Sequence, residues 1–294
     1  MSFSSTVRHI SIALRNQDLR TALERAVMSF EEKRSKSLAI EGTKELFEEV
    51  SRIKEKSLKK LDELIEKVRK QLHENDIECF FASTKEEALK IIGEIVGSNK
   101  LVVMAKSLTA NEIGLREYLE RLGNKVYETD LGELLVQLAK EPPQHILAPA
   151  IHMTRERAAK LISEVTGKSL DPSKLEEIGN AAREFLRDKF IRADVGISGA
   201  NVIAADTGMV FIIENEGNAR LVTGLPPVHI VVAGVEKIVE NTVDAFKVVL
   251  ATARSAGLPR PSYINIIAGP SKSADIEPVS YTHLRAHETE ADLV

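Results

Sequence analysis

Residues 101–109 read LVVMAKSLT: five apolar residues, then a lysine and a serine, then the beginning of a predicted helix. A short apolar run that leads directly into a capped helix is typical of a βα unit. Thr109 and Glu112 have the spacing of a capping box, in which hydroxyl and carboxylate bind free backbone donors at a helix start. The stretch therefore predicts a buried strand at 101–105 and an α/β fold.

Short apolar runs alternate with helical segments along most of the chain, which predicts a mainly parallel sheet with flanking helices. The candidate strands are 77–81, 101–105, 124–127, 145–149, 228–233 and 262–268. Thr84 and Ser173 mark further helix starts, each with a glutamate three residues later. Apolar segments 202–205 and 209–213 flank a turn sequence, so we expect a β-hairpin inserted into the sheet or beside it.

Residues 16–74 are predicted to be helical throughout, because apolar positions recur at helical spacing among charged residues. Such an amphipathic arm serves either as a cover over the core or as a surface for a partner, and the sequence leaves both open. We divide the chain into an N-terminal helical arm (1–75), an α/β domain (76–277) and a tail (278–294).

Composition excludes several classes of protein. The 294 residues, 43% of them hydrophobic, suffice for a large core, and a net charge of -4 argues against a general nucleic-acid binder. The N-terminus lacks the apolar stretch of a signal peptide, and no apolar run has the length of a membrane span. We expect a cytoplasmic protein with no membrane span and no nucleic-acid partner.

Polar residues follow several predicted strands, where open α/β sheets bind their ligands. Lys106 and Ser107 would bind an anion together with the backbone N–H groups of the next helix. Asp130 either faces the same site or caps a helix. His152 follows the predicted strand 145–149 and is either an acid or base or a hydrogen-bonded turn residue.

The densest polar cluster follows the apolar segment 209–213. It contains Glu214, Glu216, Asn218 and Arg220 around a glycine that permits close approach of a ligand. Asn201 is expected to face the same cleft. The alternative is a hydrophilic hairpin end, because turns favour asparagine and glycine.

The sequence offers no convincing metal site. His283 and His287 have the spacing that places two imidazoles on one helix face, but no third ligand accompanies them. The single cysteine, Cys79, lies in the apolar run 77–81 and is expected to be a small buried hydrophobe. We expect no metal or cofactor in this chain.

Several short motifs occur in a fixed order. They are EIGL (112–115), ETDLGE (128–133), PAIH (149–152), ADVGISGAN (193–201), TG (207–208), NEGN (215–218), PVH (227–229) and GVEK (234–237). Over roughly residues 40–276 the chain resembles the lactate-utilization (LUD) domain family, and most of all its B-type, iron-sulfur members.

The resemblance implies a fold similar to the sugar-phosphate isomerase and coenzyme A transferase superfamily. It also implies a part in the NAD-independent oxidation of L-lactate to pyruvate, with a small carboxylate (lactate or pyruvate) as ligand and other lactate-utilization subunits as partners. B-type members carry two 4Fe-4S clusters in a ferredoxin-like domain that follows the LUD domain. One cysteine cannot supply the four thiolates that a cluster needs, so that domain is missing here.

The likeness to the family stops after residues 273–277. The tail, 278–294, resembles translated sequencing-adapter sequence. We therefore expect the tail to be non-native and the natural reading frame to continue beyond residue 277.

These observations support a first hypothesis: the chain is the LUD portion of an iron-sulfur subunit of an L-lactate-oxidising complex. In this hypothesis Lys106 binds the substrate carboxylate and His152 accepts a proton. Glu214, Glu216 and Asn218 line the cleft.

Two alternatives remain open. In the first, Glu214 or Glu216 acts as nucleophile or base in a cluster-free acyl transfer or isomerisation. In the second, the chain is a non-catalytic module whose helix 41–74 docks partner subunits.

Overall fold

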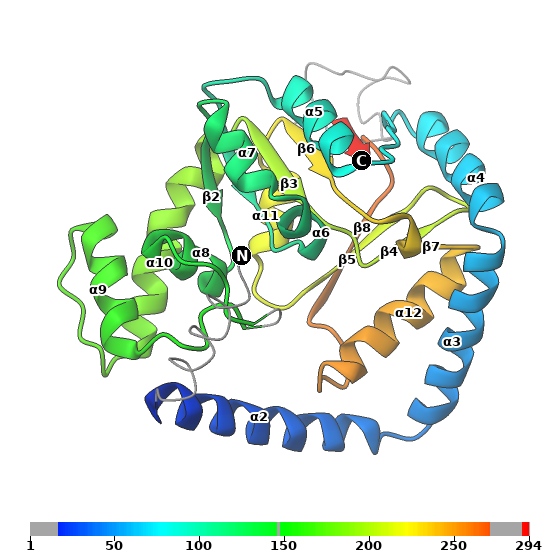
Figure 1. Cartoon of the computed structure of the whole chain (residues 1–294). Helices are drawn as coiled ribbons and strands as arrows, with labels where there is room; N and C mark the ends of the chain where they lie inside the picture. The colour runs from blue at the N-terminus through cyan, green and yellow to red at the C-terminus, as the bar shows by residue number, and fades with distance from the viewer. Residues whose placement is uncertain (1–16, 146–147, 271–289, 294) are drawn as a thin grey trace, which may run out of the picture.

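Two β-sheets with helices packed on their faces form the protein (Figure 1). The structure is a computed structural model, and it describes residues 17–145, 148–270 and 290–293. The first sheet is parallel and has the order β2-β1-β3-β6-β9. Its strands are β1 (Leu101–Met104), β2 (Lys125–Glu128), β3 (Val195–Ser198), β6 (Val228–Val231) and β9 (Glu290–Leu293). The predicted α/β fold with a parallel sheet is confirmed.

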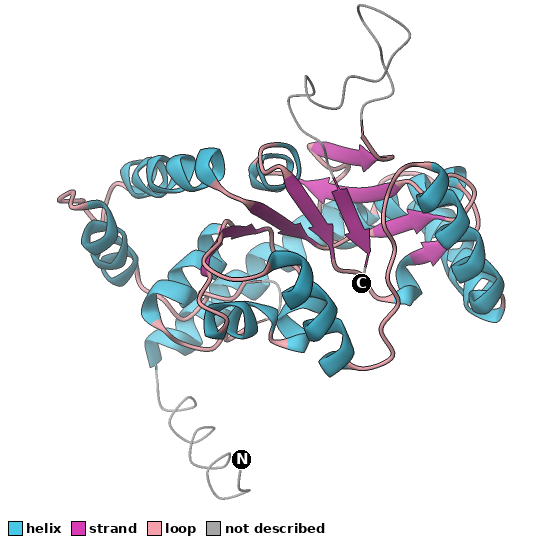
Figure 2. Ribbon diagram, turned by 90° about the horizontal axis from the view of Figure 1, so that it is seen from above, coloured by secondary structure: helices cyan, strands magenta, loops and turns pink. Residues whose placement is uncertain are grey.

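Helices cover both faces of the parallel sheet, whose strands lie as a central layer in Figure 2. One face is covered by α5 (Lys85–Val96), α6 (Leu108–Ile113) and α7 (Leu115–Arg121). The other is covered by α8 (Leu131–Ala139), α9 (Arg155–Thr166), α10 (Leu175–Arg192) and α11 (Asn218–Gly224). Val102 and Met104 of β1 pack toward the first group and Val103 toward the second, which explains the continuous apolar run.

The second sheet has the order β7-β4-β5-β8. Its strands are β4 (Val202–Ala204), β5 (Val210–Glu214), β7 (Ile238–Val239) and β8 (Tyr263–Ile267). β4 and β5 form the predicted antiparallel hairpin, which lies beside the parallel sheet and not within it. β8, predicted at 262–268, also belongs here, antiparallel to β5. α12 (Thr242–Ser255) packs on this sheet, and the short helix η1 (Val235–Lys237) precedes β7.

From residue 17 onward, where the structure describes it, the N-terminal arm is three helices and not one continuous helix. They are α2 (Gln17–Leu38), α3 (Thr43–Lys59) and α4 (Leu61–Glu74), which run around the outside of the molecule in Figure 1. Leu64, Val68 and Leu72 of α4 join the main core, and Ile53 of α3 packs with the second sheet. These residues of α3 and α4 therefore cover the core, whereas Leu58 of α3 is 53% exposed. Docking of partner subunits by residues 41–74 stays a prediction.

Two predicted strands are wrong. Residues 77–81 contain only a single-residue bridge at Cys79, whose side chain is half-buried. In the segment 145–149, residues 145, 148 and 149 lie in turn or irregular backbone, and 146–147 are outside the described residues. Pro142 and Pro143 precede that segment and Pro149 is its last residue, and proline cannot donate to a strand ladder.

The predicted helix starts are right in one case of three. Thr84 caps α5 by accepting a hydrogen bond from the backbone N–H of Glu87 at 3.2 Å. Thr109 is not a cap, because α6 already begins at Leu108 with Ser107 as its N-cap. Ser173 is not one either, since α10 begins two residues later without a side-chain cap.

Part of the C-terminal tail pairs with the parallel sheet. β9 lies parallel to β6, with Glu290 opposite Val228. The remaining tail residues, 278–289 and 294, are outside the described residues, and the non-native origin of 278–294 stays a prediction. Among the helices that the structure describes, none is both long and apolar enough to cross a bilayer.

Candidate functional site

A cleft of about 380 Å³ opens at the carboxyl ends of β1, β2 and β3. The chain passes from β1 to β2 on one side of β1, whereas β3 lies on its other side, so the winding reverses between β1 and β3. Open α/β sheets bind their ligands at such a switch point. The topology therefore marks this cleft as the candidate site.

Most of the predicted site residues line this one cleft. They are Lys106, Ser107, Asp130, Asn201, Glu214, Glu216 and Asn218. His152 and Arg220 are not among the lining residues, whereas Ser198 and Lys237 are, although the sequence did not indicate them. The cleft thus gathers segments that are far apart in the chain.

Lys106 and Ser107 lie directly beyond β1. The Ser107 hydroxyl accepts a hydrogen bond from the backbone N–H of Ala110 at 3.2 Å, so it caps α6 while it lines the cleft. The loop after β3 packs directly against Ser107, because a Cβ at Gly199 would lie 2.8 Å from Ser107 Oγ. Glycine is needed there for the β1 and β3 loops to meet.

Asp130 both caps a helix and lines the cleft. Its Oδ1 accepts hydrogen bonds from the backbone N–H groups of Gly132 and Glu133, at 3.0 and 3.2 Å. The pKa of the Glu216 carboxyl is raised by partial burial and then by the negative charge of Asp130, while the Lys106 ammonium opposes the rise. The charges of Asp130 and Lys106 thus both act on the Glu216 carboxyl.

Glu214 ends β5 as a buried carboxylate. One of its oxygens accepts from the backbone N–H of Arg220, with the amide of Asn265 3.4 Å away. The other, Oε1, has no hydrogen-bond partner among the described residues, although Arg220 Nε lies 3.4 Å from it. The Arg220 guanidinium also stacks over the Tyr263 ring at 4.1 Å, so this arginine holds Glu214 from outside the cleft.

Two amide side chains connect the walls of the cleft. Asn201 Oδ1 accepts from the backbone N–H of Ile213 at 2.7 Å, which ties the loop after β3 to β5. Asn218 Nδ2 donates to Thr129 Oγ1 at 3.4 Å and so joins the start of α11 to the end of β2. Both amides therefore hold the shape of the cleft that they line.

Ser198, one of the residues that line the cleft, contacts a buried histidine. Ser198 Oγ lies 2.8 Å from His229 Nε2, and both residues are 0% exposed. Burial lowers the pKa of His229 to about 3, so its imidazole is neutral at neutral pH. The sequence marked neither residue as a site residue: His229 falls within the predicted strand 228–233, and no strand was predicted around Ser198.

His152 lies in a different cluster. Its Nε2 is 3.0 Å from one carboxylate oxygen of Glu141, and Arg157 donates to the other oxygen at 2.7 Å. The expected position of His152 depended on a strand at 145–149, which does not form. His152 is therefore outside the cleft.

Glu128, at the end of β2, is a buried acid beside the cleft. Burial raises its pKa to about 8; Arg116 opposes this rise from 3.7 Å and Glu133 adds to it. The folded protein thus binds this proton more tightly than the unfolded chain, whose usual pKa is 4.5. The resulting stabilisation is complete below pH 4.5 and is lost as the pH rises through about 8.

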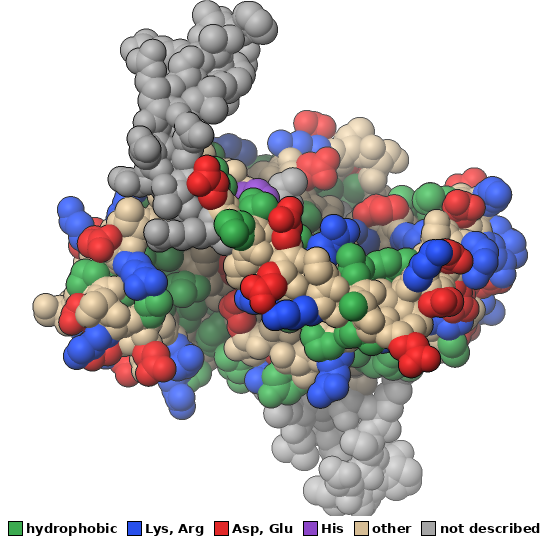
Figure 3. All heavy atoms as spheres, turned by 90° about the horizontal axis from the view of Figure 1, so that it is seen from below, with side chains coloured by type: hydrophobic (Ala, Val, Ile, Leu, Met, Phe, Trp, Pro, Cys, Tyr) green, Lys and Arg blue, Asp and Glu red, His purple; other side chains and the backbone are tan. Residues whose placement is uncertain are grey.

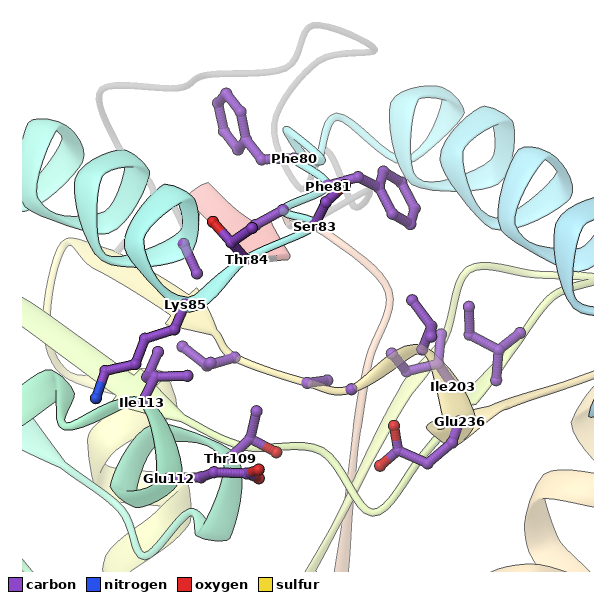
Figure 4. A pocket seen from close by; sticks show the side chains of 17 residues that line it. Phe80, Phe81, Ser83, Thr84, Lys85, Thr109, Glu112, Ile113, Ile203 and Glu236 are labelled. Atoms are coloured by element: carbon purple, nitrogen blue, oxygen red, sulfur yellow. The ribbon is translucent and has the colours of Figure 1, made fainter.

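A second cavity of about 500 Å³ adjoins the cleft (Figure 4). Thr109 lines both, and neighbouring residues of η1 divide between them, Glu236 in the cavity and Lys237 in the cleft. Its walls are largely apolar, and Figure 4 shows Phe80 and Phe81 directed away from its centre. The polar side chains that converge in the cleft favour the cleft, and not this cavity, as the functional site.

Charges of both signs are interspersed on the face in Figure 3, which shows no broad basic track there. An iron-sulfur cluster does not fit this chain, because Cys79 is its single cysteine. Within the described ranges, no group of three or more histidine, cysteine, aspartate or glutamate side chains is arranged to hold a metal ion.

Known proteins resemble this chain over most of its length. Lactate utilization protein B of Bacillus licheniformis is 36% identical over 286 residues, covering 94% of this chain and 58% of the relative. The protein of the same name from Bacillus subtilis is 38% identical over 239 residues, covering 79% of this chain and 49% of the relative. The chain therefore spans about half the length of these relatives.

A crystal structure of a DUF162 family protein from Deinococcus radiodurans covers 80% of this chain and 97% of its own length, with a TM-score of 0.45 and 14% identity. The model of the LUD domain family matches residues 65–287, which begins within α4 and extends into the tail segment that we predicted to be foreign. This match covers well over half of the sequence. The chain belongs to the LUD domain family.

Proposed function

We propose that the cleft binds a small organic carboxylate, lactate or pyruvate, and that the chain is the LUD-domain part of a lactate-utilization protein of the B type. The observation that carries the proposal is the convergence of Lys106 and Lys237 with hydroxyl and amide groups at the switch point. The name of the relatives, Lactate utilization protein B, supports the choice of ligand.

Each group has a task in this proposal. The Lys106 ammonium neutralises the charge of the ligand carboxylate. Lys237, which also pairs with Glu236 at 3.4 Å, adds a second positive charge to the lining of the cleft. Glu216 accepts the proton of the lactate hydroxyl, because a carboxyl with a raised pKa is a stronger base than an ordinary one. We assign this task to Glu216, since His152 is outside the cleft.

Oxidation of lactate to pyruvate releases two electrons and two protons, so an electron acceptor is required. The chain has one cysteine and holds no cluster by itself. We propose that the two 4Fe-4S clusters belong to the part of B-type proteins that this chain does not span, and that other lactate-utilization subunits complete the L-lactate-oxidising complex. The task of this chain is then to bind the ligand and to accept its proton.

Calorimetric titration of the chain with L-lactate and with pyruvate tests the binding. The parent should bind at least one of them, and ligand at a hundred times Kd should raise the free energy of unfolding by about 2.7 kcal/mol. Lys106→Gln should abolish binding. Lys90→Gln is the matched control, because Lys90 is an exposed α5 lysine outside the cleft. Equal affinities of the two variants would refute the role of Lys106.

A second candidate, acyl transfer, is favoured by Glu214 alone. Glu214 is a lining residue of the cleft, and its buried Oε1 has no hydrogen-bond partner in the described part of the chain; carboxylates of this kind can act as nucleophiles. Attack on a thioester carbonyl would form a mixed anhydride and release the thiolate. Incubation with acetyl-CoA followed by hydroxylamine and mass spectrometry would detect the anhydride at Glu214, and Glu214→Gln would abolish it. An unmodified parent chain would exclude this candidate.

A further inference from the structure

Glu216 is an acid of the cleft that a ligand can reach. It belongs to the loop between β5 and α11 and is exposed, whereas Glu214 is only 3% exposed. Glu216 lines the cleft and also a neighbouring pocket of about 480 Å³. Its carboxyl is therefore accessible to a molecule bound in the cleft.

Charged side chains surround Glu216 on several elements. Among the described residues that line the cleft, they are Lys106 after β1, Asp130 before α8, Glu214 of β5 and Lys237 of η1. In the neighbouring pocket they are Arg183 of α10 and Arg220 of α11, and Arg220 pairs with Glu214. The formal charges of the two lysines and of the other two acids cancel, so the protonation of Glu216 decides whether the lining of the cleft is neutral or negative.

Lactate and pyruvate differ in the group that each presents to Glu216, since the proposed function brings the C2 oxygen of the ligand to this carboxyl. In lactate that oxygen belongs to a hydroxyl, which donates to an ionised carboxylate or accepts from a protonated one. In pyruvate it belongs to a carbonyl, which only accepts. An ionised Glu216 would then be one acceptor facing another, and such an unmade hydrogen bond costs affinity.

We propose that Glu216 discriminates between the two ligands by its protonation: pyruvate binds together with a proton on Glu216, whereas lactate binds to either form of the carboxyl. This inference rests on the proposed function. In the proposed oxidation Glu216 accepts the hydroxyl proton of lactate, and the carboxyl is then in the form that pyruvate requires. Low pH therefore favours pyruvate in the cleft, and high pH favours lactate.

The surroundings of Glu216 support it as the titrating group. The cleft wall crowds its carboxyl on one side, and this partial burial raises its pKa, as does the negative charge of Asp130. Among the residues that the structure describes, no histidine lines the cleft. His229, which contacts Ser198, stays neutral because burial lowers its pKa to about 3.

Calorimetric titrations between about pH 5 and about pH 8, in buffers of different ionisation enthalpy, count the protons taken up with each ligand. For pyruvate we expect uptake of up to about one proton, and a Kd that rises about tenfold per pH unit above the pKa of Glu216. For L-lactate we expect a smaller uptake and a smaller rise. The carboxylate charge is common to both ligands, so the ratio of their Kd values isolates the effect of the C2 oxygen.

Two variants assign the effect to one residue. Glu216→Gln should remove the pH dependence of the Kd ratio, because an amide donates and accepts without titrating. Glu94→Gln is the matched control, since Glu94 is an exposed α5 acid outside the cleft. This variant should keep the ratio of the parent at every pH.

The outcomes separate this inference from the proposed function. Equal proton uptake for the two ligands would overturn the inference, and so would a Kd ratio that still depends on pH in Glu216→Gln. Failure of pyruvate to bind at about pH 5 while L-lactate binds would overturn it as well. In each of these cases carboxylate binding in the cleft still stands. Absence of binding of both ligands at every pH would refute the proposed function, and this inference with it.

Discussion

Gly196→Ala should be among the most destabilising single-methyl changes in this protein. Gly196 lies in β3, where α11 packs against the sheet, and a Cβ there would be 2.0 Å from the backbone carbonyl oxygen of Val222 and 3.0 Å from Pro226 Cγ. A side chain could rotate away, but a helix carbonyl cannot. To restore an ordinary contact, α11 would have to move away by roughly 1 Å, a displacement of the kind that overpacked cores enforce.

The expected loss is about 3 kcal/mol in the free energy of unfolding, the upper part of the usual range for overpacking. Urea unfolding followed by circular dichroism measures it as a lower midpoint with an unchanged slope. Because α11 begins at Asn218 in the cleft wall, ligand affinity should fall as well.

Gly179→Ala is the matched control for this prediction. Gly179 lies inside α10, and a Cβ there would meet no atom within 4 Å. Alanine is the better helix former, so this change should raise stability by up to about 1 kcal/mol. Equal midpoints for the two variants would refute the tight contact between β3 and α11.

Two further predictions concern Glu128 and α4. Glu128→Gln removes a carboxyl whose pKa is about 8, so it should stabilise the protein at about pH 8.5 more than at about pH 5, by roughly 4 kcal/mol. Parallel pH profiles of parent and variant in urea unfolding would contradict this. Leu72→Ala should cost about 3 kcal/mol, because Leu72 is 0% exposed, whereas Leu58→Ala should cost less than about 0.5, because Leu58 is 53% exposed. Similar thermal stabilities of these two variants would show that α4 is not a core element.

Several strands could be predicted because their signal is local. β1, β2 and β6 are short apolar runs, and three of the four residues 101–104 are fully buried between two helical layers. β3 has the same burial but carries Gly196 in its centre, which looks like a turn in the sequence. Glycine is required at position 196 because α11 packs directly against the strand there. A contact between residues so far apart in the chain leaves no sign in the local sequence pattern.

The strand predicted at 145–149 failed for the opposite reason. Its apolar residues match a buried strand in composition, but the neighbouring prolines withhold backbone donors. This error also misplaced His152, whose candidacy depended on a strand end. Arg220 was in the right cluster, yet its guanidinium pairs with Glu214 and Tyr263 outside the cleft.

The sequence by itself determined the α/β class, the hairpin and the polar residues after the strands, because all three follow from local periodicity, capping and turn chemistry. Only the tertiary structure decided which of these residues meet. Parallel strands that are distant in the chain become neighbours through the sheet order, so Lys106 and Ser198 share a cleft and Ser198 reaches His229. Contacts of this kind depend on three-dimensional packing, and the spacing of residues along the chain does not encode them.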